Sequence, residues 1–203
     1  MSPVFHQFAP ALLEDSVFHA MSPYFTKSLW RGLPMLLALA SVIVAIVAVF
    51  WTFRLRIALT DSACPPGIYQ MVNRPISRGD LVIACLPPEL AQFAEARGYL
   101  ARGHGCGDGI EPVGKRLGAL PGDTVEVTRG YIAVNGRRLA NSATLRRDSQ
   151  GRAVQHVTWG SYTVPPDQVW LLGTKDARSW DSRYFGPVPI GSVRAQLEPL
   201  VTW

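Results

Sequence analysis

The sequence predicts a mainly β domain of short antiparallel strands that follows one N-terminal transmembrane α-helix. The helix is predicted by an uncharged run of 21 residues, 33–53, because a helix needs about 20 apolar residues to cross a bilayer. The β domain is predicted by short runs rich in Val, Ile, Tyr and Trp, separated by turn signals roughly every 8–12 residues. The chain also holds 18 Gly and 16 Pro in 203 residues, which disfavours a helical bundle and favours a sandwich or a partly open barrel.

Composition and charge exclude two broad classes of protein. With 48% hydrophobic and 17% charged residues, the chain is too apolar to be disordered. The net charge of +5 comes entirely from residues 54–203, which hold 18 basic and 13 acidic side chains, whereas residues 1–53 hold two of each. No run of basic residues is longer than two, so we expect no nucleic-acid partner.

Residues 33–53 are predicted to remain in the protein as a membrane span. Trp30 and Trp51 lie near its two ends, where indole rings favour the headgroup region. A cleavable signal sequence is the alternative, but the run is longer than a typical h-region and no small-x-small site closes it. Two basic residues flank each end, so charge alone leaves the orientation open. The sequence also leaves open whether the start is Met1 or Met21.

Strands and one short helix are expected directly after the span. Residues 68–86 predict two strands joined by a turn at 75–79. Residues 88–100 follow prolines and carry apolar side chains at helical spacing, which predicts a short surface helix. A glycine-rich loop at 103–109 comes next, and 111–140 predicts strand, turn, strand, turn, strand.

The C-terminal part is also predicted to consist of strands and turns. An Asn-Gly pair at 135–136 is a strong signal for a two-residue hairpin turn. Residues 141–156 are polar and irregular, whereas 157–164 and 168–174 are typical of strands. The tail, 182–203, predicts strand and turn with a final strand.

Three cysteines offer two kinds of site. Cys85 and Cys106 could close a loop of 20 residues as a disulfide in an oxidising compartment. The odd count then leaves one thiol free, and Cys64 is the remaining cysteine. A zinc site from Cys85, His104 and Cys106 is the alternative, but it lacks a fourth ligand and any CxxC spacing. We therefore expect no metal.

Ser62 is the serine best placed to act as a nucleophile. It lies in the segment TDSACPPGIY, close behind the span. The Pro65-Pro66-Gly67 run fixes the backbone that follows, and a nucleophile gains from a fixed position. An ordinary turn serine is the plainer interpretation of the same residues.

Lys115 is the candidate general base. If VGKRLGALPGD begins as a strand, Lys115 shares a face with Val113, Leu117 and Ala119, and Arg116 points away. Burying an ammonium is costly, so burial would lower the pKa of Lys115 and favour the neutral amine. A neutral amine suits a general base. The alternative is a lysine whose head reaches solvent at a strand edge.

The segment GTKDARSWDSRYFG brings Ser179, Asp181 and Arg183 within five positions. On an extended backbone Asp181 and Arg183 share a face, which predicts a structural ion pair. Ser179 could then offer its hydroxyl to Lys115 and hold the amine in place.

Four boxes of the sequence resemble, in the same order, those of the signal peptidase I superfamily of membrane-bound Ser/Lys endopeptidases. They are SxxP beginning at Ser62, RGDLV at 78–82, KRLGALPGD at 115–123 and GTKDARSWDSRYFG at 173–186. TDSxxPxGIY and the cysteine pair are most similar to the conjugative-transfer (TraF-type) branch. Ala63 stands where leader peptidases usually have Met, and Thr-Lys replaces their Asp-Asn in the last box. These departures bear on substrate choice more than on chemistry.

The resemblance implies a catalytic dyad that needs no histidine, metal or cofactor. By position, Ser62 is the nucleophile, and Lys115 takes its proton and later gives it to the leaving amine. The implied supporting residues are Thr60 with the Ser62 backbone N–H as oxyanion donors, Ser179 to orient the lysine, and the Asp181–Arg183 ion pair. His104 and His156 are expected at the surface.

The resemblance also implies a place in the cell and a substrate. Residues 1–32 would be cytoplasmic, 33–53 would span the bacterial inner membrane once, and 54–203 would form a periplasmic peptidase domain with a helix/loop insertion at 86–110. Ser62 follows Phe53 by nine residues, so it lies within ~32 Å of the bilayer edge. The implied substrate is a membrane-associated precursor with small side chains before the cut, most simply a conjugative pilin. Its maturation, including cyclisation, would involve components of a conjugation or type IV secretion system.

Other functions remain open at this stage. The shared boxes equally suit a general signal peptidase I that removes leader peptides from secreted proteins. The span and the basic domain alone suit a non-catalytic envelope scaffold. A self-cleaving Ser/Lys repressor fits less well, because a membrane span stands where such proteins carry a DNA-binding region.

Overall fold

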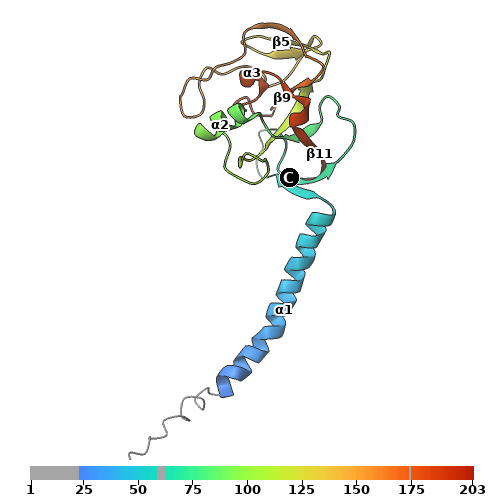
Figure 1. The fold of residues 1–203 in the computed structure, drawn as a ribbon, viewed down its shortest axis with the longest axis vertical. Coiled ribbons are helices and arrows are strands. Elements are labelled where there is room, and N and C mark those ends of the chain that lie inside the picture. Colours follow the sequence, from blue (N-terminus) through green and yellow to red (C-terminus); the bar gives the residue numbers. More distant parts are fainter. Residues whose placement is uncertain (1–22, 59–62, 174) are drawn as a thin grey trace, which may run out of the picture. The chain divides into compact units, whose positions relative to one another are not determined.

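The computed structural model describes residues 23–58, 63–173 and 175–203. The chain divides into two units, residues 1–49 and 50–203, and every strand among the described residues belongs to the second (Figure 1).

The helix α1 (Pro23–Thr52) is 30 residues long. Its segment Leu33–Thr52 has a mean hydropathy of 2.8, and within the described residues it is the one helix long and apolar enough to cross a membrane. The large apolar side chains of this segment are exposed, including Met35 and Trp51. These properties fit a single-pass membrane anchor, in agreement with the predicted span at 33–53.

The second unit is mainly β, as predicted, with two antiparallel sheets. The seven-stranded sheet has the order β1-β2-β11-β3-β4-β9-β10, and the four-stranded sheet has the order β7-β6-β5-β8. The strands of the large sheet are β1 (Leu55–Ala58), β2 (Gly67–Val72), β3 (Leu81–Ala84), β4 (Val113–Ala119), β9 (Gln168–Leu172), β10 (Val188–Pro189) and β11 (Val193–Thr202). Those of the small sheet are β5 (Thr124–Val127), β6 (Ile132–Val134), β7 (Arg137–Arg138) and β8 (Gly160–Thr163).

Three hydrophobic clusters form the core of this unit. The first lies between the large sheet and the helix α2 (Pro88–Ala96), with Val82, Ala91 and Leu117 among its buried members. The second joins the small sheet to β9 through Trp170 and Leu172. The third packs around Tyr69. Burial of these side chains from water is the main force that holds the sheets and α2 together.

One turn connects the two sheets. The carboxylate of Asp123, directly before β5, accepts hydrogen bonds from the Leu120 N–H at 2.8 Å, from Asn135 Nδ2 at 2.9 Å, and from both Arg78 Nε and Nη2. Burial alone would raise the pKa of Asp123, but these hydrogen bonds outweigh it and hold the pKa below its ordinary value. The turn therefore depends on an ionised carboxylate.

The two strands predicted within 68–86 are confirmed as β2 and β3, and β11 lies between them in the sheet. Two other sequence expectations need correction in this unit. The helix predicted at 88–100 ends at Ala96, two residues before Gly98, which has a φ of +69°. The tail contains a short helix, α3 (Ser182–Phe185), and the 3-10 turn η1 (Ile190–Ser192), where only strand and turn were expected.

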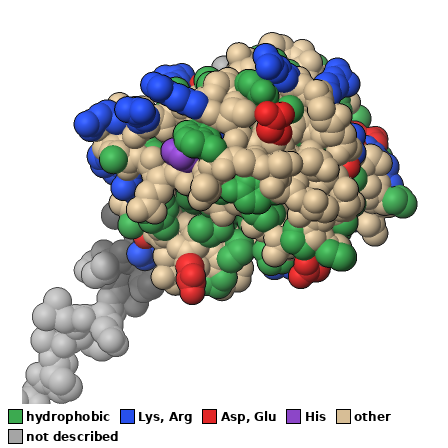
Figure 2. All heavy atoms as spheres, turned by 90° about the horizontal axis from the view of Figure 1, so that it is seen from above, with side chains coloured by type: hydrophobic (Ala, Val, Ile, Leu, Met, Phe, Trp, Pro, Cys, Tyr) green, Lys and Arg blue, Asp and Glu red, His purple; other side chains and the backbone are tan. Residues whose placement is uncertain are grey.

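The surface of the second unit reflects its charge. Figure 2 shows a group of Lys and Arg side chains at the upper left of the face seen from above, and others spread over its top and right. His104 is exposed and His156 is half-buried, so the surface position predicted for His156 is only partly correct. The ring of His156 stacks on that of Trp159, with centroids 3.8 Å apart.

Candidate active site

Lys115 lies on the buried face of β4. Along this strand the residues alternate between buried and more exposed positions, which places Lys115 on the same face as Val113 and Leu117. Its partner across the ladder is Val82 of β3, which is fully buried. Lys115 itself is 7% exposed, so the strand-face interpretation was right and the solvent-reaching alternative was wrong.

The surroundings of Lys115 favour its neutral amine. Burial lowers the pKa of Lys115 because the charged form loses its hydration. The carboxylates of Asp181 and Asp176 act in the opposite direction, while the positive charge of Arg183 adds to the lowering. The pKa of Lys115 therefore lies below the ordinary value of a lysine.

Ser179 holds the amine of Lys115. Lys115 Nζ donates a hydrogen bond of 2.5 Å to Ser179 Oγ, and within the described residues this is the one hydrogen bond of the amine. Ser179 is itself 5% exposed, and its N–H donates to the carbonyl of Asp176 at 3.0 Å. The hydroxyl is thus fixed on the backbone side and directed at Lys115.

Arg183 and Asp181 form a buried ion pair beneath Ser179. Arg183 Nε donates to Asp181 Oδ1 at 2.8 Å and Nη2 donates to Oδ2 at 2.9 Å. Arg183 Nη2 also donates to the Ser179 carbonyl at 2.8 Å. Its Nη1 donates to three further carbonyl oxygens, those of Asn141, Ala143 and Ala177. The guanidinium therefore uses all its N–H groups and ties Ser179 to the segment after β7.

The ion pair has a different local geometry from the one expected. Asp181 and Arg183 do not lie on an extended segment, because Asp181 caps the N-terminus of α3 and accepts a hydrogen bond from the Arg183 N–H at 3.1 Å. Asp181 Oδ2 also accepts from the Gly173 N–H, and Ser182 Oγ accepts from the Leu171 N–H, both at 2.8 Å. Since β9 pairs with β4, these contacts fix α3, and with it Ser179, against the strand that carries Lys115.

Ser62 and Thr60 lie outside the described residues, so their proposed roles stay predictions. The chain on both sides of them is described. Ala58, the last residue of β1, pairs with Gly67 of β2. Ala63 and Cys64 are buried in the cluster around Tyr69.

Cys64, the free cysteine, is buried beside Tyr69. Tyr69 Oη donates to the Pro65 carbonyl at 2.7 Å. Burial, together with a hydrogen bond to Cys64, raises the pKa of Tyr69 to about 12. The Tyr69 hydroxyl therefore stays protonated and fixes the backbone just after the predicted nucleophile.

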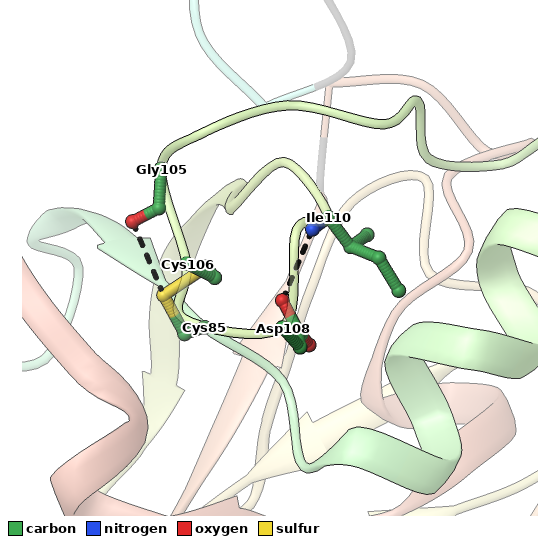
Figure 3. Close-up of a disulfide and its surroundings, with 5 residues drawn as sticks. All are labelled: Cys85, Gly105, Cys106, Asp108 and Ile110. Carbon is green, nitrogen blue, oxygen red and sulfur yellow. Dashed lines mark hydrogen bonds between the residues drawn. A yellow bond between two sulfur atoms is a disulfide. The ribbon is translucent and has the colours of Figure 1, made fainter.

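Cys85 and Cys106 form the predicted disulfide (Figure 3). Their Cα atoms are 5.8 Å apart, within the usual range. The alternative zinc site is excluded because both thiols are consumed by the bond. Across the described ranges, no three His, Cys, Asp or Glu side chains converge as metal ligands. In the loop next to Cys106, the Ile110 N–H donates to Asp108 Oδ1 at 3.1 Å.

Most of the chain is similar to known proteins. A model of the family described as signal peptidase, peptidase S26, matches residues 30–202. The chain belongs to this family. It is 38% identical over 177 residues to a conjugal transfer protein TraF of Agrobacterium tumefaciens (strain 15955), covering 85% of this chain and 97% of the relative. It is 35% identical over 75 residues to a signal peptidase I of Leptolyngbya laminosa, covering 37% of this chain and 34% of the relative. A crystal structure of a signal peptidase I from Enterococcus faecalis V583 aligns with a TM-score of 0.37 at 26% identity, covering 63% of this chain and all of that one.

Within this member of the signal peptidase S26 family, the structure brings together four of the residues singled out from the sequence. Lys115, Ser179, Asp181 and Arg183 form one hydrogen-bonded cluster that joins β4 to α3. Membership of the family implies a serine peptidase. The arrangement can hold a buried, neutral amine in a fixed position, which is what proton abstraction from a serine hydroxyl requires.

Sequence reasoning missed the contacts that support this cluster. Two of the four carbonyl groups that bind Arg183 belong to Asn141 and Ala143, in a segment interpreted only as irregular. Trp180, next to Ser179, contacts the rings of Phe93, Tyr99 and Phe185. The disulfide was the one signal that related residues 86–105 to the rest of the domain, and it gave no indication of which side chains they meet.

Proposed function

We propose that this chain is a membrane-anchored serine endopeptidase that uses Ser62 as nucleophile and Lys115 as general base. The observation that carries the proposal is the buried amine of Lys115, whose pKa is lowered and which donates to Ser179 at 2.5 Å. A lysine with those properties, in a member of the signal peptidase S26 family, has a clear chemical use. The lowered pKa leaves a larger fraction of this amine neutral, and so able to accept a proton, than in an exposed lysine.

Catalysis would begin with proton transfer from Ser62 Oγ to Lys115 Nζ. The serine oxygen then attacks the scissile carbonyl carbon. The negative charge that develops on the oxygen of this carbonyl is stabilised by the Ser62 N–H and the Thr60 hydroxyl. Collapse of this intermediate expels the amine of the leaving segment, which takes the proton from Lys115. Ser179 holds the amine in line for both transfers, because its backbone is fixed by Arg183, which donates to its carbonyl, and by the Asp176 carbonyl, which accepts from its N–H.

The acyl-enzyme can be released in two ways. Water attack gives a shortened, linear product. Attack by the N-terminal amine of the same acyl segment gives a cyclic product, provided that this amine is held close while water is kept out. We propose a conjugative pilin precursor as the substrate, because the most extensive similarity reported above is to a conjugal transfer protein.

The proposed site of action is the periplasmic side of the bacterial inner membrane. The helix α1 supplies the anchor, and the short link from it to Ser62 keeps the nucleophile near the membrane surface. The Cys85–Cys106 disulfide supports an oxidising compartment. A substrate that is itself anchored in the membrane would reach the site without leaving the bilayer.

The test is co-expression of the full chain with the pilin precursor of its own conjugation system, followed by mass spectrometry of the pilin. We expect a shortened or cyclised pilin with the wild type and the unprocessed precursor with Ser62→Ala and Lys115→Ala. Ser149→Ala and Lys175→Ala are the matched controls, because both residues are exposed and lie outside the cluster. An unprocessed pilin with folded wild-type chain, or full processing by Ser62→Ala, would contradict the proposal.

A general leader peptidase is the second candidate, favoured by the family match and by the similarity to a signal peptidase I. It predicts that depletion of the chain blocks the export of many proteins. Normal export with loss of pilin maturation would assign the chain to conjugation alone. Retention of conjugation by Ser62→Ala would favour the envelope scaffold over both enzymes.

A further inference from the structure

The disulfide closes an insertion that covers the face of the large sheet carrying Lys115. The part of the predicted 86–110 insertion that the disulfide closes is residues 86–105, here called the insertion, and it contains α2. Its Leu86 and Ala91 belong to the same buried cluster as Val82, Val113 and Leu117. The last three are the neighbours of Lys115 across the ladder and along β4. The insertion is therefore part of what keeps water from this face.

A second contact connects the insertion to the hydroxyl partner of Lys115. Trp180 directly follows Ser179, and its ring stacks on Phe93 of α2 with centroids 5.8 Å apart. Tyr99 packs against the same indole at 5.4 Å and Phe185 of α3 at 4.7 Å. The indole thus lies among rings from the insertion and from α3, which restricts where Ser179 can move.

A third contact reaches the support of Arg183. Tyr99 Oη donates to Asp148 Oδ2 at 2.7 Å, and Arg152, which also donates to Asp148, donates to the Arg97 carbonyl at 2.7 Å. These hydrogen bonds hold the insertion to residues 141–156, the segment whose carbonyl oxygens bind Arg183.

We propose that Trp180 is a positioning residue through which the disulfide-closed insertion fixes Ser179 and keeps the Lys115 amine dry. The consequence of this contact for catalysis rests on the proposed function. Its effect on the hydration and protonation of Lys115 does not. Loss of the disulfide or of the indole would let the insertion move away from the sheet. Water would then reach Lys115, and its proton affinity would rise.

The effect comes from apolar cover, since the charges near Lys115 belong to other elements. Asp176, Asp181 and Arg183 are the charged groups that act on it most, and all three lie in the last box rather than in the insertion. The charged side chains of the insertion are Glu89, which is exposed, Glu95 and Arg102, which pair at 3.0 Å, and Arg97, which pairs with Asp148. An opened insertion would therefore hydrate Lys115 without removing a charge partner.

The experiment measures the protonation of Lys115 directly. The chain has only three lysines, Lys27, Lys115 and Lys175, so lysine labelled with carbon-13 at Cε gives three NMR signals whose shifts follow pH. Full-length chain in detergent is titrated, the signals are assigned by Lys→Gln variants, and Lys175, which is exposed, supplies a control signal in the same spectra.

We expect the Lys115 midpoint to rise by about one pH unit or more in the Cys85→Ser/Cys106→Ser variant and in Trp180→Ala. Trp180→Phe, which keeps a ring against Phe93, should restore most of the wild-type value. Trp159→Ala is the matched control, because this tryptophan is 43% exposed and belongs to the small-sheet region. In active preparations, the acidic limb of the pH profile of kcat/KM should move by the same amount as the midpoint.

An unchanged Lys115 midpoint in both the double serine variant and Trp180→Ala would overturn the proposal. If the double variant unfolds, Trp180→Ala decides, because it keeps the disulfide. A shifted midpoint that is not restored by Trp180→Phe would also overturn the role of the ring contacts. A shifted midpoint in a chain that cleaves no precursor would support this inference and refute the proposed function, so the two failures are distinguishable.

Discussion

Replacing Lys115 by methionine should stabilise the chain at neutral pH while removing its proposed activity. The substitution keeps an unbranched side chain of similar length on the buried face of β4 and removes the amine. It loses the hydrogen bond to Ser179, worth about 1 kcal/mol. It also removes the cost of deprotonating or burying the amine, and this second contribution depends on pH.

The direction of this pH dependence follows from the lowered pKa of Lys115 in the folded chain. Between that value and the ordinary lysine value of about 10.4, the unfolded chain binds one more proton than the folded chain. The free energy of unfolding of the wild type therefore rises with pH across this window, by up to about 1.4 kcal/mol per pH unit. The gain in the free energy of unfolding from Lys115→Met is therefore largest near the lower end of this window and declines toward alkaline pH.

The assay is denaturation of the full-length chain in detergent, followed by tryptophan fluorescence, for wild type and Lys115→Met at several values between about pH 7 and about pH 10. Lys175→Met controls for the loss of one exposed ammonium. A difference between wild type and Lys115→Met that stays constant with pH would mean that folding does not change the protonation of Lys115. That result would refute both the buried neutral amine and the role built on it.

Three further predictions concern the supporting structure. Arg183→Lys should lower the free energy of unfolding by about 3–5 kcal/mol, because a lysine cannot satisfy both oxygens of buried Asp181 and the surrounding carbonyls. Denaturant titration measures this loss, and a loss under ~1 kcal/mol would contradict the prediction. Cys85→Ala/Cys106→Ala should cost about 3 kcal/mol by the loop-entropy model, and an unchanged melting temperature would argue against it. The ionised carboxylate of Asp123 contributes stability above about pH 3.9, and this contribution is lost as the pH falls toward its lowered pKa. Asp123→Asn should remove this contribution, and identical acid-unfolding curves for wild type and variant would contradict the prediction.

The parts of the fold governed by local pattern could be predicted from the sequence. The apolar run at 33–53, the alternation around Lys115 and the Asn-Gly turn at 135–136 each have one dominant local cause, and the structure agrees with all three. The Cys85–Cys106 disulfide was one of two alternatives offered by the sequence, with a zinc site as the other, and the structure contains the disulfide.

The parts governed by long-range contact could not be predicted in this way. β11 enters the sheet between β2 and β3, and no local signal records a pairing across more than a hundred positions. The segment SRYF is only four residues long as a helix, too short for periodicity to reveal. Its start depends on the Asp181 cap, which sequence reasoning assigned to an extended ion pair instead.

The two buried basic side chains of the site, Arg183 and Lys115, have opposite surroundings. Every N–H group of Arg183 has an acceptor, and a carboxylate is among them, so its charge is fully compensated. Lys115 has one hydroxyl partner within the described part of the chain, and burial lowers its pKa, which favours the neutral amine. The carboxylate and carbonyl partners of Arg183 instead stabilise its charge. Because Arg183 binds the carbonyl of the residue whose hydroxyl meets Lys115, the guanidinium also helps to set the position of that hydroxyl.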